Sequence, residues 1–391
     1  MNSSLKCVEV VVFLFALTGC GSADKSSLPS NAGESLDQEE IEALAAIKKF
    51  GGDVQVIGGG TPMYLNRETE MVSPKRLHPD DKPLRLPVHL SDGSRFYKVV
   101  LDNTAEIDIV LTHLKRLNDN GRFDLSFVDT QVADAELAHL KGLANIIRLE
   151  LYNTQVTDAG LEHLSGLTEV IALNLTKTRI TDAGLEQIKR LTGLEELYLI
   201  DSQISDAVLE HLSEMTSLHT LFLGNNQISD VGLMHLQGMS KLKNLTLNDT
   251  KITDAGLVHI KGLTNLEGLL LSNTQLTDAG LEHLTGLTNL EDLSLDNIQI
   301  TDTGLVHLAG MTKLIHLILN STQIADDGLE QLIGLNSLKN LRLSNTQISD
   351  AGLERLEEMS TLENLYISNT QATGQGIKKL QEALPNCEIH H

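Results

Sequence analysis

Histidine is the residue type whose spacing most suggests chemistry in this chain. Seven histidines recur at one position of a repeating pattern: His139, His163, His211, His235, His259, His283 and His307. Aligned imidazoles could bind a metal ion or sense pH. If each lies on its own short helix, neighbouring helix axes are about 8–10 Å apart, whereas two ligands of one ion lie within about 3–4 Å of each other. We therefore expect partly buried histidines on helix faces, and no metal or other cofactor.

Two further features raise the question of catalysis. Gly58-Gly59-Gly60 follows the strand-like DVQVI, but the spacing is neither GxGxxG nor that of a GK[ST] phosphate loop, so a flexible turn is the better interpretation. The irregular segment 58–97 also holds titratable residues without a motif spacing: Glu68, Glu70, His78, Asp80 and Asp81. An enzyme with a site in this segment is the weakest alternative, and we expect a non-enzymatic chain.

The elements that position these residues follow from a strict repeat of 24 residues. NTQVTDAGLEHLSGL at 153–167 returns as NTQLTDAGLEHLTGL at 273–287 and as NTQISDAGLERLEEM at 345–359. One leucine column runs at this interval through Leu175, Leu199, Leu223, Leu247, Leu271, Leu295, Leu319 and Leu343. Ten copies cover 146–385 and a divergent eleventh covers 122–145. Such a period predicts a stack of identical supersecondary units.

Each unit combines two hydrophobic periods. LEELYLI at 194–200 alternates as a strand does, and Leu161, Leu164 and Leu167 recur every three residues as on a short helix. Thr157 or Asp158 can cap that helix at its start. A glycine column is predicted to end each helix in the left-handed conformation: Gly142, Gly166, Gly238, Gly262, Gly286, Gly310 and Gly334. Small residues at the helix starts, such as Gly160 and Gly184, would let neighbouring coils approach closely.

One unit cannot bury its leucines alone, so the units must stack. Strands in register lie about 4.8 Å apart, whereas helices need about 8–10 Å between axes. The stack must therefore bend into a horseshoe. We predict an α/β solenoid with a parallel concave β-sheet and short convex α-helices.

The ninth position of each unit carries a polar column that points inward at the turn after the strand. Its members are Thr154, Thr178, Ser202, Asn226, Thr250, Thr274, Thr322, Thr346 and Thr370. Buried hydroxyls and amides need partners, and here they can bond backbone groups of the turning chain. Ile298 breaks the column, and we predict that one nearby backbone group bonds water instead.

The pattern LxxLxLxxT followed by ITDAGLxxLxxL resembles leucine-rich repeats, nearest to the ribonuclease-inhibitor-like class with a helix in each coil. The resemblance covers residues 122–391, although the ninth position of the family is usually Asn or Cys and is mostly Thr here. It implies a binding scaffold that uses the concave sheet and catalyses no reaction.

The N-terminus reads as an export signal. Residues 1–20 contain one lysine, the apolar run Val10–Leu17 and the sequence LTGC, which resembles the bacterial lipobox in which the cysteine receives a lipid. An ordinary secretory signal cut elsewhere is the alternative. We expect lipidation at Cys20, a polar tether over 21–37, and a location at the cell membrane or outer membrane, facing the periplasm or exterior. Of the remaining cysteines, Cys7 would leave with the signal, and Cys387 is expected to be a buried end-cap residue.

The remaining segments are expected to cap the stack. Residues 38–121 form an N-terminal cap, in which 38–57 reads as a helix followed by a strand and 97–117 as a degenerate repeat. The repeats then occupy 122–385, and 386–391 completes the C-terminal cap with a last strand at Ile389. The net charge of −23 disfavours nucleic acid as a partner. We expect a monomer.

Variable residues at the third, fifth and seventh positions of each unit should face the concave side. Tyr198, Ile200 and Phe222 fall on adjacent coils and predict one exposed apolar patch edged by Glu196 and Glu150, as in a protein-binding hot spot. Simple cross-strand stacking of aromatics is the alternative interpretation. The candidate partner-binding residues are Arg148, Glu150, Tyr152, Glu196, Tyr198, Ile200, Phe222, Leu270, Asp292, Ile318, Arg342 and Tyr366. We predict a membrane-anchored scaffold for a protein partner; a structural or adhesive envelope protein without a specific ligand is the alternative.

Overall fold

The computed structural model describes residues 38–49, 52–57, 95–101, 107–117 and 121–391. The chain divides into two compact units, which we describe separately. The N-terminal unit contains residues up to 156 together with 166–170, and the C-terminal unit contains 157–165 together with 171–391. The predicted signal, the lipid site Cys20, the tether, the glycine run 58–60 and the titratable residues between Glu68 and Asp81 lie outside the described residues.

The N-terminal unit is built on a four-stranded sheet. Its elements are α1 (Gln38–Lys49), β1 (Gly52–Ile57), β2 (Arg95–Leu101), α2 (Ile107–Leu117), β3 (Gly121–Ser126), α3 (Asp134–Leu137), the 3₁₀ helix η1 (Ala138–Leu140) and β4 (Ile146–Glu150). β1 pairs antiparallel with β2, whereas β2, β3 and β4 run parallel. Tyr97 and Phe123 stack in its core at 5.6 Å. The helix and strand predicted over 38–57, and the strand and helix predicted over 97–117, are all present.

The C-terminal unit repeats a strand, a turn and a short helix. Its strands are β5 (Ala172–Asn174), β6 (Glu196–Tyr198), β7 (Thr220–Phe222), β8 (Asn244–Thr246), β9 (Gly268–Leu270), β10 (Asp292–Ser294), β11 (His316–Ile318), β12 (Asn340–Arg342), β13 (Asn364–Tyr366) and β14 (Glu388–His390). All are parallel and in register at the 24-residue interval. β14 confirms the last strand expected at Ile389.

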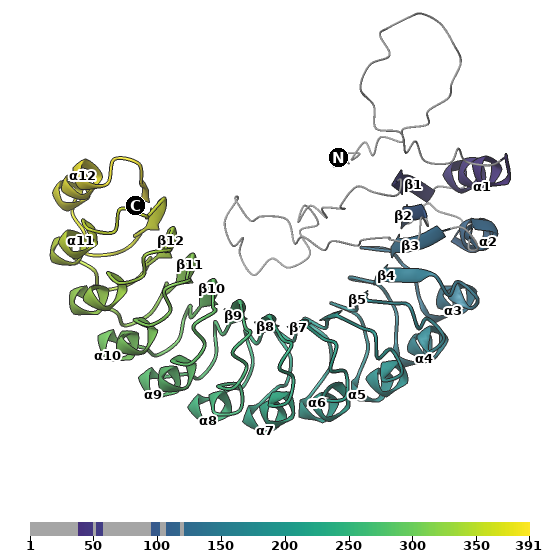
Figure 1. Cartoon of the computed structure of the whole chain (residues 1–391), viewed down its shortest axis with the longest axis horizontal. Helices are drawn as coiled ribbons and strands as arrows, with labels where there is room; N and C mark the ends of the chain where they lie inside the picture. Colours follow the sequence, from purple (N-terminus) through teal and green to yellow (C-terminus); the bar gives the residue numbers. More distant parts are fainter. Residues whose placement is uncertain (1–37, 50–51, 58–94, 102–106, 118–120) are drawn as a thin grey trace, which may run out of the picture. The chain divides into compact units, whose positions relative to one another are not determined.

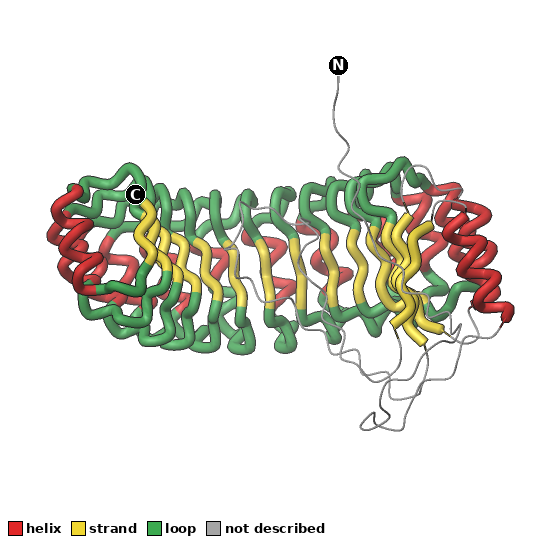
Figure 2. The backbone as a smooth tube through the Cα atoms, turned by 90° about the horizontal axis from the view of Figure 1, so that it is seen from above, coloured by secondary structure: helices red, strands yellow, loops and turns green. Residues whose placement is uncertain are grey.

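The helices of this unit are one or two turns long except for the last. They are α4 (Asp158–Leu161), η2 (Glu162–Leu164), α5 (Asp182–Leu185), η3 (Glu186–Ile188), α6 (Asp206–Leu212), α7 (Asp230–Leu233), η4 (Met234–Leu236), α8 (Asp254–Leu257), α9 (Asp278–Leu281), η5 (Glu282–Leu284), α10 (Asp302–Leu305), η6 (Val306–Leu308), η7 (Asp326–Leu332), α11 (Asp350–Leu356) and α12 (Gly374–Ala383). Within this unit the strands line the inner side of an arc and the helices its outer side (Figure 1). Figure 2 shows the strands side by side in one row. The predicted solenoid architecture is confirmed.

The core between the two layers is almost entirely aliphatic. The repeat leucines on the strand and on the helix, for example Leu197 and Leu209, are fully buried. The ninth-position column behaves as predicted: Thr250 Oγ1 donates to the carbonyl of Leu247 at 2.6 Å, and Thr178, Thr274, Thr322 and Thr346 make the equivalent bond. Ile298 is buried at this column and has no polar side-chain atom to donate; the water predicted beside it stays a prediction.

The prediction for the glycine column at the helix ends is wrong in all but one coil. Gly142 has φ of 89°, whereas the other six glycines of that column do not enter the left-handed region. The left-handed residue falls instead at the eighth position of the unit, directly before the polar column, with φ between 52° and 58°. Its members are Asp129, Asn153, Lys177, Asp201, Asn225, Asp249, Asn273, Asn297, Ser321, Asn345 and Asn369. The chain turns from strand to helix there, so that position carries the unusual backbone conformation.

Candidate protein-binding surface

The inner face of the C-terminal unit is set by strand alternation. In β6, Leu197 points into the core, so Glu196 and Tyr198 on either side of it face the opposite way. Every strand from β5 to β14 repeats this arrangement at the same register. The third and fifth positions therefore form two parallel columns along the inner face, as predicted. The seventh position, which was predicted to join them, lies in the turn after the strand, as at Ile200.

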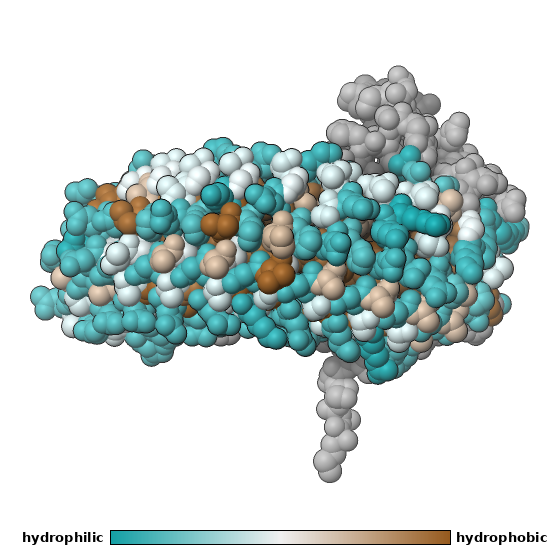
Figure 3. All heavy atoms as spheres, turned by 90° about the horizontal axis from the view of Figure 1, so that it is seen from below, coloured by the Kyte–Doolittle hydropathy of each residue, from teal (hydrophilic) through white to brown (hydrophobic). Residues whose placement is uncertain are grey.

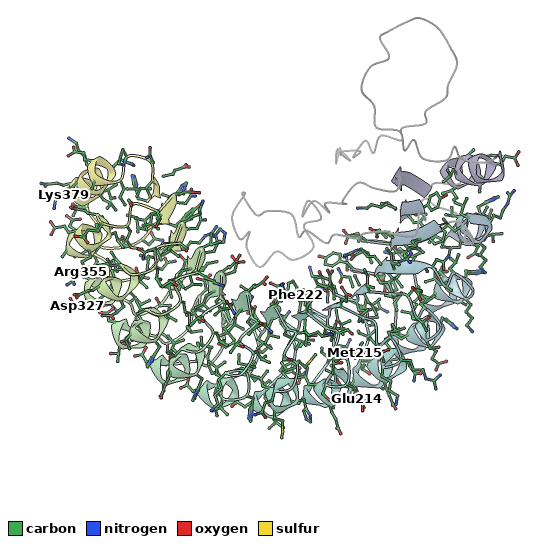
Figure 4. The ribbon with its side chains drawn as sticks, in the orientation of Figure 1. Glu214, Met215, Phe222, Asp327, Arg355 and Lys379 are labelled. Atoms are coloured by element: carbon green, nitrogen blue, oxygen red, sulfur yellow. The ribbon has the colours of Figure 1, made fainter. Side chains whose placement is uncertain are left out.

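An aromatic patch lies on β6 and β7. Tyr198 and Phe222 are register partners, and their rings meet edge to face with centroids 5.0 Å apart and planes at 88°. Both side chains are half-buried, as is Ile200. Figure 4 shows Phe222 on the inner side of the arc. The predicted adjacency of Tyr198 and Phe222 is confirmed, and we call these two residues the inner aromatic patch. Ile200 was predicted to join them and lies in the turn after β6.

The acidic residue beside this patch differs from the prediction. Glu196 is only 1% exposed, and its Oε2 accepts a hydrogen bond of 2.9 Å from the hydroxyl of Tyr198. Leu270 and Ile318, also predicted as exposed contact residues, are buried as well. Strands about 4.8 Å apart on a concave face bring neighbouring side chains close enough to cover one another. The in-and-out alternation of residues along a single strand does not predict this burial. Glu196 thus orients Tyr198 instead of forming an exposed rim.

A second cluster lies at the C-terminal end of the same column. The Tyr366 ring stacks on the His390 ring at 4.2 Å and 10°, and the guanidinium of Arg342 lies 4.6 Å from the Tyr366 centroid. The three side chains come from β12, β13 and β14 and are half-buried. Arg342 and Tyr366 were predicted as contact residues, and His390 was not. The repeat could have predicted His390 as a contact residue, because it follows Tyr366 by one repeat length.

A polar ladder occupies the third-position column beside this cluster. Asp292 Oδ1 lies 3.8 Å from His316 Nε2, and His316 Nδ1 lies 2.9 Å from Asn340 Nδ2. Asn364 Nδ2 then donates to Asn340 Oδ1 at 2.8 Å. Asp292 was predicted as a contact residue. The contacts along this ladder hold the side chains of His316, Asn340 and Asn364 in one orientation.

Of the predicted residues of the N-terminal unit, Arg148 and Glu150 lie on β4 and Tyr152 lies in the turn after it. Arg148 Nη1 is 3.6 Å from Glu150 Oε1, and Glu150 is 8% exposed. Glu150 was predicted as an exposed edge of the patch, and its burial beside Arg148 corrects that expectation. Tyr152 is half-buried, and its carbonyl accepts from the amide of Asp129 at 3.0 Å.

The histidine column lies on the short outer helices, or for His259 in the turn directly after α8, and each of the seven residues is partly buried as expected. His139 Nε2 lies 3.0 Å from Asp108 Oδ1. Among the described residues, no group of three or more His, Cys, Asp or Glu side chains is placed to hold a metal ion. Within that same part of the chain, no helix is long and apolar enough to cross a membrane.

Cys387 is buried at the C-terminal end of the stack, as predicted. Burial, with a smaller contribution from Glu388, raises the pKa of its thiol to about 11. A thiol with this pKa carries almost no thiolate near neutral pH and is a poor nucleophile.

Comparison with known proteins agrees with this geometry. The family description "Leucine Rich repeats (2 copies)" matches residues 216–259 and 264–307, and "Leucine Rich repeat" matches 310–332 and 334–356. None of the curated proteins matches the chain. The chain carries leucine-rich repeats, and its fold is that of a leucine-rich repeat solenoid.

Three solved bacterial structures are similar to the chain. An internalin of Listeria monocytogenes is 24% identical over 75% of this chain and 86% of its own, with a TM-score of 0.56. Internalin C2 of the same organism is 32% identical over 55% of this chain and 84% of its own, with a TM-score of 0.44. A leucine-rich repeat protein of Leptospira interrogans is 18% identical over 75% and 89%, also with a TM-score of 0.44. The first of these shares the fold.

Proposed function

We propose that this chain is a non-enzymatic scaffold that is exported, held at a membrane by a lipid, and binds a protein partner through the inner face of its solenoid. The observation that carries the proposal is the inner aromatic patch. Within the repeat the core and turn columns hardly vary, whereas the inner-face columns change from coil to coil. A surface that varies on an invariant frame is suited to recognition.

The inner aromatic patch has the properties of an anchor for a partner. Large aromatic side chains dominate binding energy at protein interfaces when they are held in well-packed surroundings. Here the edge-to-face contact fixes both rings, and the bond to Glu196 fixes the Tyr198 hydroxyl. A side chain ordered before binding loses little entropy on association. The mechanism is therefore complementarity of a preformed surface, without making or breaking a covalent bond.

The proposal of a membrane anchor rests on the sequence LTGC ending at Cys20. Growth with a radiolabelled fatty acid should label the wild-type protein and leave the Cys20→Ala variant unlabelled. Equal labelling of both, or of neither, would remove lipidation at Cys20 from the proposal. The acidic surface further leads us to expect a monomer without affinity for nucleic acid.

The partner is best sought with the intact protein in its native membrane. Chemical cross-linking and mass spectrometry would identify the captured species, and its affinity would then be measured for purified variants. Tyr198→Ala and Phe222→Ala should each weaken binding by about tenfold or more, since loss of a hot-spot residue costs at least about 2 kcal/mol. Val306→Ala, on the outer helices, is the matched control and should bind as the wild type does.

The alternatives give different results in the same experiment. A structural or adhesive envelope protein would return envelope polymer or no specific species, and the inner aromatic patch would be dispensable. Loss of folding in Tyr198→Ala and Phe222→Ala, with no separable defect in binding, would support a purely structural role for the two rings. Loss of a hydrolytic activity on deletion of 58–97 would instead indicate an enzyme.

A further inference from the structure

Ten exposed and uncharged side chains form two columns along the edge of the C-terminal unit where the chain turns from strand to helix. The eighth position of five successive coils supplies Asn273, Asn297, Ser321, Asn345 and Asn369. The tenth position of the same coils supplies Gln275, Gln299, Gln323, Gln347 and Gln371. We call these ten residues the edge amide face. The chain holds 53 acidic and 30 basic residues, yet none of them stands in either column over these five coils.

Backbone hydrogen bonds between coils fix the spacing of the glutamines. The N–H of Gln299 donates to the carbonyl of Leu276 on the preceding coil at 3.1 Å, and Gln299 pairs in parallel with Thr277. The other four glutamines of the face donate to the preceding coil in the same way, at 2.8–2.9 Å. Adjacent chains of such a parallel ladder lie about 4.8 Å apart. The five glutamine side chains therefore stand in a row at about this interval.

The two columns differ in how their side chains are held. Asn297 Nδ2 donates to Asn273 Oδ1 at 2.8 Å. Asn369 Nδ2 donates to Asn345 Oδ1 at 3.1 Å, so several amides of the eighth position are bonded to one another along the edge. The glutamine side chains form no hydrogen bond with any part of the chain that the structure describes. Their amide donors and acceptors are therefore open to a ligand.

The fold does not require glutamine at the tenth position. Arg179 and Lys251 occupy it in two other coils of the unit, so different side chains are accepted there. Exposed positions on the outer helices vary from coil to coil: Met234 and Val306 stand where Glu282 stands in its own coil. Figure 3 shows that outer face as mostly hydrophilic with scattered hydrophobic residues. The uniform glutamines of the edge amide face thus call for an explanation other than packing.

A row of identical groups at a constant interval is complementary to a ligand that repeats at the same interval. A glutamine amide carries both donors and an acceptor, as does a sugar with its hydroxyl groups. The sugars of an extended β-1,4-linked glycan follow one another at an interval close to that of adjacent coils. We infer that the edge amide face binds a linear, uncharged, β-1,4-linked polysaccharide that lies along the five coils.

The charges of the chain favour an uncharged polymer. A polyanion would be repelled by the net charge of −23. A polycation would find no carboxylate in either column of the face, and the nearest acidic column is engaged already. In that column Asp278 and Asp302, for example, are partly buried and accept hydrogen bonds from the N–H groups of the following coil. This inference does not depend on the inner aromatic patch.

Binding at this face should depend steeply on the length of the glycan. A single hydrogen bond between an exposed amide and a hydroxyl contributes little, because water competes for both groups. When sugars are linked, each later contact forms at a high effective concentration. Affinity should therefore rise with each added sugar until the glycan covers the five coils.

The test uses the full-length protein and oligosaccharides of defined length. Cellobiose, cellotetraose, cellohexaose and chitohexaose are titrated by isothermal calorimetry, with maltohexaose as the α-linked control of equal length. Gln299→Ala/Gln323→Ala/Gln347→Ala removes the three central amides at exposed positions, and circular dichroism verifies its fold. Gln203→Ala/Gln227→Ala makes the same change in the same column outside the face and is the matched control.

Docking on the edge amide face predicts that at least one of the two β-linked hexasaccharides binds about tenfold or more tightly than cellobiose. The triple variant should weaken that binding by about tenfold or more, since three of the five contacts are lost. Gln203→Ala/Gln227→Ala and Phe222→Ala should leave it within about twofold, because distant sites without shared contacts act independently. Maltohexaose should bind no more tightly than cellobiose, since its chain is not extended.

Four results would overturn the inference. The first is the absence of binding by both cellohexaose and chitohexaose, and the second is unchanged hexasaccharide binding in the triple variant. The third is equal binding of maltohexaose, which would show that the interval of the glutamines is not recognised. The fourth is self-association of the wild type in sedimentation that the triple variant abolishes, which would identify a second copy of the chain as the occupant of the face.

Discussion

The carboxylate of Asp278 accepts two hydrogen bonds from Thr301 on the next coil. Its Oδ1 takes the backbone N–H of Thr301 at 2.7 Å and its Oδ2 takes the Thr301 hydroxyl at 2.6 Å. Thr301 in turn caps α10 by accepting from the amide of Thr303. The first residue of one helix therefore holds the cap of the next. The same pair of bonds recurs from Asp158 to Asp350 wherever the capping residue is Ser or Thr.

Replacing Asp278 by alanine should destabilise the C-terminal unit by about 2 kcal/mol, because two charge-assisted bonds between coils are lost and a partly buried N–H loses its acceptor. The measurement is urea unfolding followed by circular dichroism. Glu282→Ala removes an exposed acid four residues later and should change the midpoint little. Equal loss of stability in both variants would contradict a specific role for the bond between coils.

Asp350 should make the C-terminal helix sensitive to acid. The backbone N–H of Thr373, and then its hydroxyl, donate to Asp350 and hold the pKa of that carboxyl below its usual value. A lowered folded-state pKa contributes stability that is present above the unfolded value, about 3.9, and is lost as pH falls through the folded value. Hydrogen exchange of α12 should therefore accelerate below about pH 4. In Asp350→Asn, the protection of α12 from hydrogen exchange should no longer change with the protonation of a carboxyl at this position. An acid response equal to that of the wild type would contradict the role given to Asp350.

Two glycines of one coil should respond oppositely to alanine. A methyl group at Gly304 would lie 2.5 Å from Asp278 Oδ1, so Gly304→Ala should be destabilising even though alanine favours helix by about 1 kcal/mol. Gly310 has no neighbouring atom within 4 Å of such a methyl group and no positive φ. Gly310→Ala should therefore be neutral or stabilise by up to about 1 kcal/mol. Thermal unfolding of the two variants measures both effects. A stabilising Gly304→Ala would be inconsistent with the close approach of Asp278 Oδ1 to that position.

The histidine column should bind no zinc tightly. Its imidazoles lie one to a coil on the outer helices, too far apart to share an ion without distorting the stack. Isothermal titration with zinc should show at most weak binding, unchanged in His259→Gln, since Gln187 and Gln331 already replace histidine in two coils. Tight binding that this variant abolishes would show that the spacing argument is wrong.

The features that depend on the repeat period could be read from the sequence. Strand alternation placed Tyr198 beside Phe222, and the buried ninth column followed from the need to pair hydroxyls such as that of Thr250. The left-handed position was assigned to the wrong column because glycine is its usual signal, whereas Asn and Asp, as at Asn153, also adopt it.

The features that depend on contact between coils could not be read in the same way. Thr157 or Asp158 was predicted to cap the helix that begins there, and Thr157 does so by accepting from the amide of Ala159. The bond from Asp158 to Thr181 of the next coil was not predicted. The burial of Glu196 and Glu150 likewise depends on side chains from neighbouring strands. A single repeat unit, considered alone, does not contain these neighbours.

The most direct test of the central claim is site-specific photo-cross-linking in the native membrane. A photoreactive amino acid would replace Phe222 on the inner face in one variant and Val306 on the outer face in another. The proposed function predicts that the variant with the photoreactive residue at position 222 gives one discrete protein adduct and that the variant at position 306 does not give this adduct. Excess wild-type protein should reduce the yield of the adduct, whereas excess Tyr198→Ala protein should not. The same adduct from both positions, or an adduct from position 306 alone, would contradict recognition through the inner face.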